Sequence, residues 1–262
     1  MQYSTVLVST ADHISTLTLN RPDKLNALND EMAVEFLNAF AAAEKDPEVR
    51  VIVLSGAGRA FSAGADLQES FLNPVLEGKP SQVLSGWPEE ACALFRRTTK
   101  PVIASINGPA IGFGCAVCLA CDIRIASKNA RMGLGFVRIG TIPGDGATFY
   151  LPRLVGMGKA CELVFTSKVI DAYEAEKIGM VNRVVDEADL KDATYELAKT
   201  LVAAPPLALY WAKQALYQSL DSSFSSQIRF ETIGQATCHA SQDFIEAIKS
   251  FLEKRSPNYT GK

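Results

Sequence analysis

The chain has 262 residues, of which 48% are hydrophobic and 21% charged, proportions that suit a globular protein with a sizeable core. Its net charge is −3 and no basic block is present, so nucleic acid is not expected as a partner. No run approaches the roughly 18 apolar residues of a membrane span, and the N-terminus lacks a signal-peptide pattern. We therefore expect no membrane association and a cytoplasmic location.

Three of the six cysteines, Cys115, Cys118 and Cys121, recur at helical spacing inside an apolar stretch. Free cysteines in such a setting are usually buried thiols. A metal or cluster site would need loop geometry and a clear fourth ligand, and the sequence shows neither. We expect no metal and a reducing compartment.

The first part of the chain predicts a hairpin followed by a helix and a buried strand. Residues 6–8 and 14–19 alternate in the manner of two paired strands. Asn29 or Asp30 is a suitable cap for a helix that runs to about Glu44, and residues 50–54 form a fully apolar strand. Residues 68–90, rich in proline and glycine, predict an irregular loop, and Pro88 opens a helix that ends near Arg97.

The central stretch, Lys100 to Asp122, combines a buried strand, a turn and an apolar helix. Residues 101–106 are apolar, Asn107-Gly108-Pro109 is turn chemistry, and small residues then lead into a helix that ends near Cys121. Gly112 and Gly114 flank Phe113, so its backbone N–H can approach a ligand at the positive end of the helix. Such a donor can hold a developing oxyanion if a second donor lies nearby. The alternative is that these glycines serve close packing only.

The remaining chain predicts three strands and five helices. Strands are expected at 122–127, 131–133 and 180–185, and helices at 158–166, 171–178, 190–203, 206–219 and 224–254.

A second strand followed by a loop of small residues, Ser55 to Leu67, precedes the central one by about forty residues. Together with several other segments, these two loops resemble the crotonase superfamily of enoyl-CoA hydratases and isomerases. The matching segments are Asn20-Arg21-Pro22, Asn26-Ala27-Leu28, Phe61 to Asp66, Lys100 to Ala104, Asn107-Gly108, Cys121 to Ala126, Gly140 to Gly144 and Gly179 to Asn182.

The resemblance implies an α/β fold in which strand–strand–helix units form a right-handed spiral. It also implies a spiral core at 1–195 that holds the CoA and acyl site, and a C-terminal helical cover at 196–262 that mediates trimerisation. In the family pattern, the backbone N–H groups of Ala65 and Phe113 form the oxyanion hole for a thioester carbonyl. The segment at 68–90 would cover the acyl pocket.

The catalytic acids of the family are not at their usual places. Hydratases carry two glutamates, and the aligned residues here are Ala116 and Phe136. Some other members carry an aspartate at the position of Gly144, and here the aspartate follows one residue later, as Asp145. The two histidines, His13 and His239, lie outside both loops, so members that need a pocket histidine fit poorly.

Asp145 is therefore the candidate acid or base, and its alternative role is to cap the helix that begins near Ala147. Glu69, Glu89, Glu90 and Arg138 are lesser candidates.

Coenzyme A is expected as part of the substrate thioester, with no prosthetic group. By the family pattern its binding residues are Lys24, Leu25, Ala27, Ala63, Asp66 and Leu67, with Lys24 facing a phosphate. Phe251 and Lys254 resemble residues that reach the nucleotide of a neighbouring subunit in a homotrimer or dimer of trimers. Their alternative reading is a helix end with a favourable cation.

The sequence leaves three functions open. The first is an acyl-CoA enzyme that stabilises an enolate and moves protons, as an isomerase or lyase does. The second is an enoyl-CoA hydratase that uses a non-standard carboxylate. The third is a catalytically inactive acyl-CoA-binding paralogue.

Overall fold

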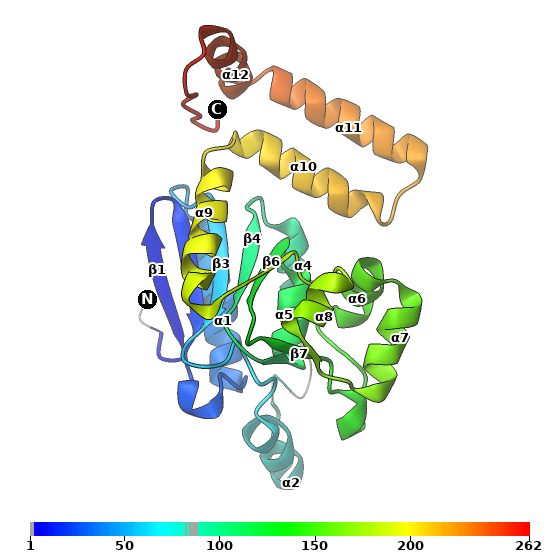
Figure 1. Cartoon of the computed structure of the whole chain (residues 1–262). Helices are drawn as coiled ribbons and strands as arrows, with labels where there is room; N and C mark the ends of the chain where they lie inside the picture. The colour runs from blue at the N-terminus through cyan, green and yellow to red at the C-terminus, as the bar shows by residue number, and fades with distance from the viewer. Residues whose placement is uncertain (1–2, 82, 84–88) are drawn as a thin grey trace.

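The computed structural model describes residues 3–81, 83 and 89–262, and the side chains of residues 89–91 are not described. Within this part of the chain, the larger sheet has the strand order β1-β2-β3-β4-β6-β9 (Figure 1). Its strands are β1 (Val6–Ala11), β2 (Ile14–Leu19), β3 (Val51–Gly56), β4 (Val102–Ile106), β6 (Ile123–Ser127) and β9 (Arg183–Val185). The β1–β2 hairpin is antiparallel, and the other neighbours in this sheet are parallel.

A smaller sheet contains β5 (Ala110–Ile111), β7 (Arg131–Gly133) and β8 (Ile170–Asp171). The order of elements repeats along the chain: β4 and β5 precede α5 (Phe113–Ala120), and β6 and β7 precede α6 (Ala147–Val155). In each unit the first strand joins the larger sheet and the second joins the smaller one. This α/β arrangement of strand–strand–helix units is the expected one.

Both faces of the larger sheet are covered, which explains its continuous apolar strands. Ile52 and Leu54 of β3 face the main core, where Phe36 and Phe40 of α1 (Asp30–Lys45) pack. Val51 and Val53 face the other way, into a second cluster with Ala198 of α9 (Leu190–Val202). The expected helix cap is confirmed, because the Asn29 side chain accepts a hydrogen bond from the Met32 N–H.

Three helices follow α9 and lie over one end of the sheet (Figure 1): α10 (Pro206–Ser219), α11 (Phe224–His239) and α12 (Gln242–Glu253). The prediction of one continuous helix over 224–254 is wrong. The chain breaks at Ala240–Ser241, where Ser241 Oγ donates to the Cys238 carbonyl and accepts from the Phe244 N–H. Serine is a favoured N-cap residue, so α12 begins as a separate helix at this point.

A buried ion pair fixes α10 to the core. Lys213 Nζ lies 2.8 Å from Asp122 Oδ2 and donates to the Lys100 carbonyl at 2.9 Å. The Tyr217 hydroxyl donates to the other oxygen of Asp122 at 2.7 Å. Asp122 also accepts from the Val102 N–H at the start of β4, so it links α10 to the sheet. Asp122 therefore has a structural role in this fold.

The segment that follows the Ala65 loop is more regular than its composition predicts. Residues Leu67–Leu72 form a π-helix, and α2 (Asn73–Glu77) continues it. The Asp66 carboxylate accepts from the Glu69 N–H and caps the first turn, and Pro74 stands where a helix needs no N–H. The predicted irregular loop at 68–90 is wrong for residues 68–77. Pro88, expected to open the next helix, lies outside the described residues, and α4 spans Glu89–Arg97.

The described chain also contains the short helices η1 (Pro22–Lys24), η3 (Val137–Ile139) and η4 (Glu187–Asp189), with α7 (Met157–Thr166) and α8 (Ala172–Lys177) between the last two. Among the helices described, none has both the length and the apolar character needed to cross a membrane.

Candidate active site

The two small-residue loops singled out in the sequence lie directly against each other. Ser62 pairs with Ala110 in an isolated parallel bridge, and the Ile111 N–H donates to the Ser62 carbonyl at 2.9 Å. A Cβ atom on Gly114 would stand 2.7 Å from both the side chain and the carbonyl of Ser62. Glycine at 114 therefore permits the start of α5 to touch the upstream loop.

Ala65 pairs with Leu28 in a second isolated parallel bridge. The Leu28 N–H donates to the Gly64 carbonyl at 2.7 Å, and the Asp66 N–H donates to the Leu28 carbonyl at 2.8 Å. These two bonds flank Ala65 on the Leu28 side, so its own N–H points the other way. In the part of the chain described, no acceptor takes a hydrogen bond from the Ala65 N–H.

Phe113 is the first residue of α5, at the positive end of that helix. It follows Gly112, which has φ 53° and ψ −117°, a conformation that favours glycine. Gly64, with φ 101°, approaches Gly112 closely: a Cβ on Gly64 would lie 3.7 Å from the Gly112 Cα. The structure thus brings together the loops that carry Ala65 and Phe113.

The two positions that the resemblance implies for the family glutamates, Ala116 and Phe136, are apolar and packed. Ala116 is fully buried in α5, and its backbone N–H donates to the Gly112 carbonyl at 2.9 Å. Phe136 packs against the same core cluster, just before η3. These two sites offer no proton donor or acceptor from a side chain.

Asp145 lies in a strained turn ahead of α6. Its φ is 55°, and Gly146 follows with φ 78°, so two successive residues occupy the left-handed region. A non-glycine residue in this region costs free energy and is often found at functional sites. The helix-cap interpretation is wrong, because Gly146 holds the N-cap position of α6 and no side chain caps this helix. In the described part of the chain, no donor reaches the half-buried Asp145 carboxylate.

The surroundings of Asp145 are poorly hydrated. Burial raises the pKa of the Asp145 carboxyl above its ordinary value. Burial also raises the pKa of the Cys92 thiol on α4, and the charge of Asp145 raises it further, so the two groups are neighbours. Tyr150, whose ring lies against Gly146, has its pKa raised to about 12, chiefly by burial. A half-buried carboxylate whose pKa is raised by burial is a candidate for proton transfer.

The lesser acid–base candidates fare differently. Glu69 Oε2 lies 3.0 Å from Arg21 Nη2 and also accepts from the Asn29 amide, so it is engaged in an ion pair. Arg138 is exposed on η3. Glu89 and Glu90 belong to α4, but their side chains lie outside the described residues.

The residues expected to hold coenzyme A gather at the Ala65 loop. Lys24 ends η1 with an exposed side chain, and no carboxylate in the described structure pairs with it. The Leu25 carbonyl accepts from the Ala63 N–H at 2.9 Å, which joins the two segments. Ala27 is buried, whereas Leu67 is 53% exposed.

Phe251 and Lys254 lie elsewhere. Both are exposed at the end of α12, with Phe251 82% exposed. Figure 1 shows α12 at the opposite end of the molecule from α2, which continues the Ala65 loop. Within one chain these two residues and the Ala65 loop do not meet.

Sequence reasoning missed the side chains that brace these loops. The Arg21 guanidinium binds the Ala27 carbonyl and the Asp66 carboxylate. The Asn26 amide donates to the carbonyls of Ala57 and Ala60, and the Asn107 amide donates to those of Gly58 and Ala60. The motifs Asn20-Arg21-Pro22 and Asn107-Gly108 were the available signal, because polar residues beside turn residues often bond to nearby backbone.

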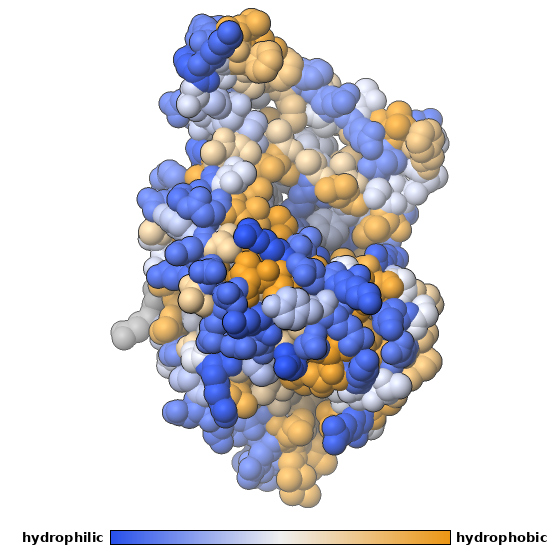
Figure 2. Space-filling model, viewed as in Figure 1, coloured by the Kyte–Doolittle hydropathy of each residue, from blue (hydrophilic) through white to orange (hydrophobic). Residues whose placement is uncertain are grey.

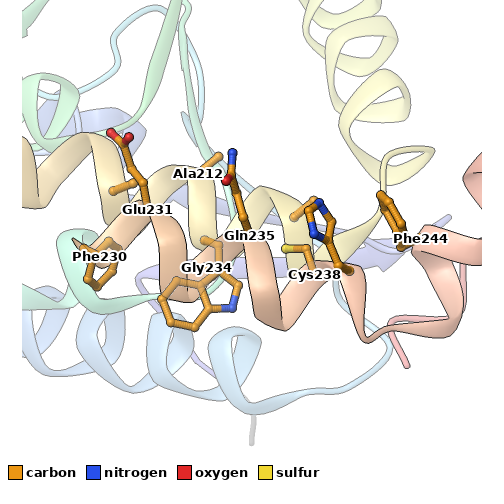
Figure 3. Close-up of a pocket in the computed structure, with 11 residues that line it drawn as sticks. Ala212, Phe230, Glu231, Gly234, Gln235, Cys238 and Phe244 are labelled. Atoms are coloured by element: carbon orange, nitrogen blue, oxygen red, sulfur yellow. The ribbon is translucent and has the colours of Figure 1, made fainter. Parts of the chain in front are cut away.

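A separate cavity of about 340 Å³ lies between α10 and α11 (Figure 3). Phe230, Gly234, Cys238 and Phe244 line it, and none of the candidate site residues does. Cys115 and Cys118 of α5 and Cys121 directly after it are buried free thiols, as expected, and burial raises the pKa of Cys115 to about 12. No group of three or more metal-ligating side chains occurs among the described residues.

Comparisons with known proteins agree with this arrangement. Residues 9–262 match the sequence pattern of the family described as enoyl-CoA hydratase/isomerase. The short-chain-enoyl-CoA hydratase of Clostridium acetobutylicum is 38% identical over 259 residues, which cover 97% of each chain. The 1,2-epoxyphenylacetyl-CoA isomerase of Escherichia coli is 36% identical over 252 residues, 95% of each chain.

A crystal structure of an enoyl-CoA hydratase, subunit I, from Geobacillus kaustophilus is similar at a TM-score of 0.90 and 36% identity, covering 100% of both chains. Sequence and fold therefore agree over essentially the full length. The chain belongs to the enoyl-CoA hydratase/isomerase (crotonase) family and is an acyl-CoA-processing enzyme of that family.

Proposed function

We propose that this enzyme forms a thioester enolate and moves a proton within the acyl group, as an isomerase or lyase does. The observation that carries the proposal is the half-buried Asp145 carboxylate, unpartnered in the described structure, in a protein whose two family glutamate positions are Ala116 and Phe136. A carboxylate with a raised pKa is suited to take and return a proton near neutral pH.

In the proposed step, the Asp145 carboxylate removes a proton from the carbon next to the thioester carbonyl. The electron pair moves into the carbonyl, and the backbone N–H groups of Ala65 and Phe113 stabilise the oxyanion. The protonated Asp145 then returns the proton to another carbon of the same conjugated system. The double bond shifts while the atoms and charge of the substrate are conserved.

Coenzyme A is proposed to lie across the Ala65 loop. Lys24 would meet a phosphate, and Leu25, Ala27, Ala63, Asp66 and Leu67 would contact the nucleotide and pantetheine. The exposed ammonium of Lys24, which pairs with no carboxylate among the described residues, and the exposed Leu67 support this placement, because they offer a cation and an apolar contact. No prosthetic group takes part in the proposed reaction.

We also propose a trimer or a dimer of trimers, with residues 196–262 as the cover and oligomerisation part. The C-terminal helices expose many large apolar side chains, among them Leu216, Phe224, Phe251 and Leu252 at 72–82%. Figure 2 shows apolar atoms over these helices at the upper end of the molecule. Exposed apolar surface of this extent marks an interaction site. Phe251 and Lys254 would then reach the nucleotide of a neighbouring copy. Sedimentation of a monomer at micromolar concentration would contradict the assembly.

Hydration is the second candidate, because the Clostridium acetobutylicum relative is a short-chain-enoyl-CoA hydratase. In that case one carboxylate would have to activate the water, and a second carboxyl group would have to protonate the substrate carbon. Glu69 is held by Arg21, which leaves Asp145 as the carboxylate free to act in the described part of the site.

One experiment separates these reactions. The enzyme is incubated in deuterated water with a panel of enoyl-, dienoyl- and ketoacyl-CoA esters, and products are followed by mass spectrometry and proton resonance. An isomerase moves the double bond or exchanges α-hydrogen without adding water, whereas a hydratase adds the mass of one water. If no ester reacts while CoA still binds, the protein is an inactive acyl-CoA-binding paralogue and the proposal is wrong.

A further inference from the structure

Arg21 binds both of the segments that form the bridge at Ala65, the proposed oxyanion donor. Its Nη1 atom donates to the Ala27 carbonyl at 2.7 Å, and Ala27 directly precedes Leu28, the bridge partner of Ala65. Both terminal nitrogens lie 3.3 Å from Asp66 Oδ2, and Asp66 directly follows Ala65. One guanidinium thus ties together the two segments whose bridge orients the Ala65 N–H.

The clasp is largely buried and reinforced. The exposed fraction is 13% for the Arg21 side chain and 10% for that of Asp66. Glu69 adds a second carboxylate at 3.0 Å, itself fixed by the Asn29 amide at 3.1 Å. The Arg21 backbone is held as well, because its N–H donates to Asn26 Oδ1 at 2.9 Å. Charge-assisted bonds of low exposure are the strong kind and hold their geometry.

Arginine suits this position for a geometric reason. Its planar fork can reach a carbonyl and two carboxylates at once, whereas a lysine ammonium is a point charge on a flexible stem. The three acceptors approach from residues 27, 66 and 69, which a single lysine nitrogen would not satisfy together.

We propose that Arg21 is a positioning residue that holds the Ala65 N–H at the place where the thioester oxyanion develops. The inference rests on the proposed oxyanion hole. Arg21 itself does not touch the reacting atoms. Because a displacement of about 1 Å in an active site can cost about a hundredfold in rate, loss of the clasp should reduce kcat more than substrate affinity.

The test compares Arg21→Lys and Arg21→Met with the wild type and with Arg50→Met. Arg50 is a matched control, since its guanidinium also binds two backbone carbonyls, those of Val202 and Tyr259, but it precedes β3, whereas the Ala65 loop follows the other end of that strand. The readouts are kcat, KM, affinity for free CoA, and the absorption of a bound cinnamoyl-type CoA thioester. The absorption of this chromophore moves to longer wavelength when its carbonyl is polarised by hydrogen-bond donors.

Both Arg21 variants are expected to lose about tenfold to a hundredfold in kcat and much of the spectral shift, with KM and CoA affinity changed by no more than about threefold. Arg21→Lys should not restore kcat or the spectral shift, because the charge of a lysine alone does not replace the planar guanidinium. Arg50→Met should keep kcat and the shift even if its unfolding midpoint falls.

If the wild type shifts the chromophore and the Arg21 variants shift it equally, Arg21 has no positioning role. If the wild type gives no shift, the oxyanion hole itself is wrong and the role of Arg21 falls with it. Should both Arg21 variants fail to fold, Asp66→Asn decides. It keeps the oxygen that accepts from the Glu69 N–H and replaces the oxygen that accepts from Arg21. It should show the same loss of kcat in smaller degree, and the affinity for free CoA is measured alongside, because Asp66 is also a proposed CoA contact.

Discussion

Replacing Asp145 with Asn should lower turnover and raise stability at neutral pH. Asparagine has nearly the same size and tolerates the left-handed backbone of this turn, where φ is 55°. It cannot exchange a proton. Loss of a general acid–base group typically costs about 10²-fold to 10⁴-fold in kcat, or about 3–5 kcal/mol of transition-state stabilisation.

The stability effect has the opposite sign, and its pH dependence follows from the pKa shift. Burial raises the pKa of folded Asp145 above the ordinary value of 3.8, so the folded protein favours the protonated form. The wild type therefore loses stability as the pH rises from the unfolded pKa through the higher folded pKa. The variant does not titrate there. It should be more stable at pH 7, and this advantage should disappear below the ordinary pKa of about 3.8, where the carboxyl is protonated in both states.

The assay pairs kcat on the accepted CoA ester with urea unfolding at pH 7 and pH 4. A loss of kcat together with a gain of unfolding free energy at pH 7 is the signature of a carboxylate held for function. Full turnover in the Asp145→Asn variant would refute the catalytic role, and a lower unfolding free energy at pH 7 would refute the claim that the carboxylate has no stabilising partner. Asp171→Asn is a matched control, since Asp171 is an exposed cap whose side chain accepts from the Glu174 N–H.

Two further predictions concern charged groups outside the proton-transfer site. Lys24→Ala should weaken binding of free CoA about fivefold at low salt and less at high salt, because an exposed ion pair contributes about 1 kcal/mol and is screened; unchanged affinity in calorimetry would contradict the phosphate placement. Lys213→Met should lower the free energy of unfolding by about 3 kcal/mol in urea titration, since it leaves the Asp122 carboxylate buried without its cation; a change below about 1 kcal/mol would show that the pair does not fix α10.

The sequence predicted most of the core because its signals are local. The run at 51–54 is apolar on both faces, and the structure covers both faces of β3. The loops at Ala65 and Phe113 were recognisable because close approach demands small residues, as Gly114 against Ser62 shows. The cap at Asn29 was also a local signal, since its side chain accepts a hydrogen bond from the N–H three residues ahead.

Features that depend on distant partners were not predictable in this way. Proline and glycine between 68 and 90 indicated an irregular loop, yet the Asp66 cap and its bond to Arg21, 45 residues away, order the first part as helix. Only Ala240 and Ser241 separate α11 from α12, so the two helices were predicted as one. That Asp145 lacks a donor in the described structure is also a property of the fold, because its sequence context fits a helix cap equally well.

Because Ala116 and Phe136 carry no acid or base, a single carboxylate, that of Asp145, limits the chemistry available to the enzyme. Addition of water needs one group to activate the water and another to protonate carbon, whereas movement of a double bond needs one group that serves twice. If Asp145 alone moves the proton, a proton taken from substrate stays on a half-buried carboxyl until it is returned. A substrate deuterated at the α-carbon and reacted in ordinary water should then retain a measurable part of its label at the new carbon. The side chains of Phe136 and Ala116 carry no second exchangeable proton. The retention of label in the wild type should therefore exceed that in a Phe136→Glu variant, in which a second carboxyl can exchange its proton with solvent. Complete loss of the label in the wild type would show that a second base or water carries the proton, and would favour hydration over isomerisation.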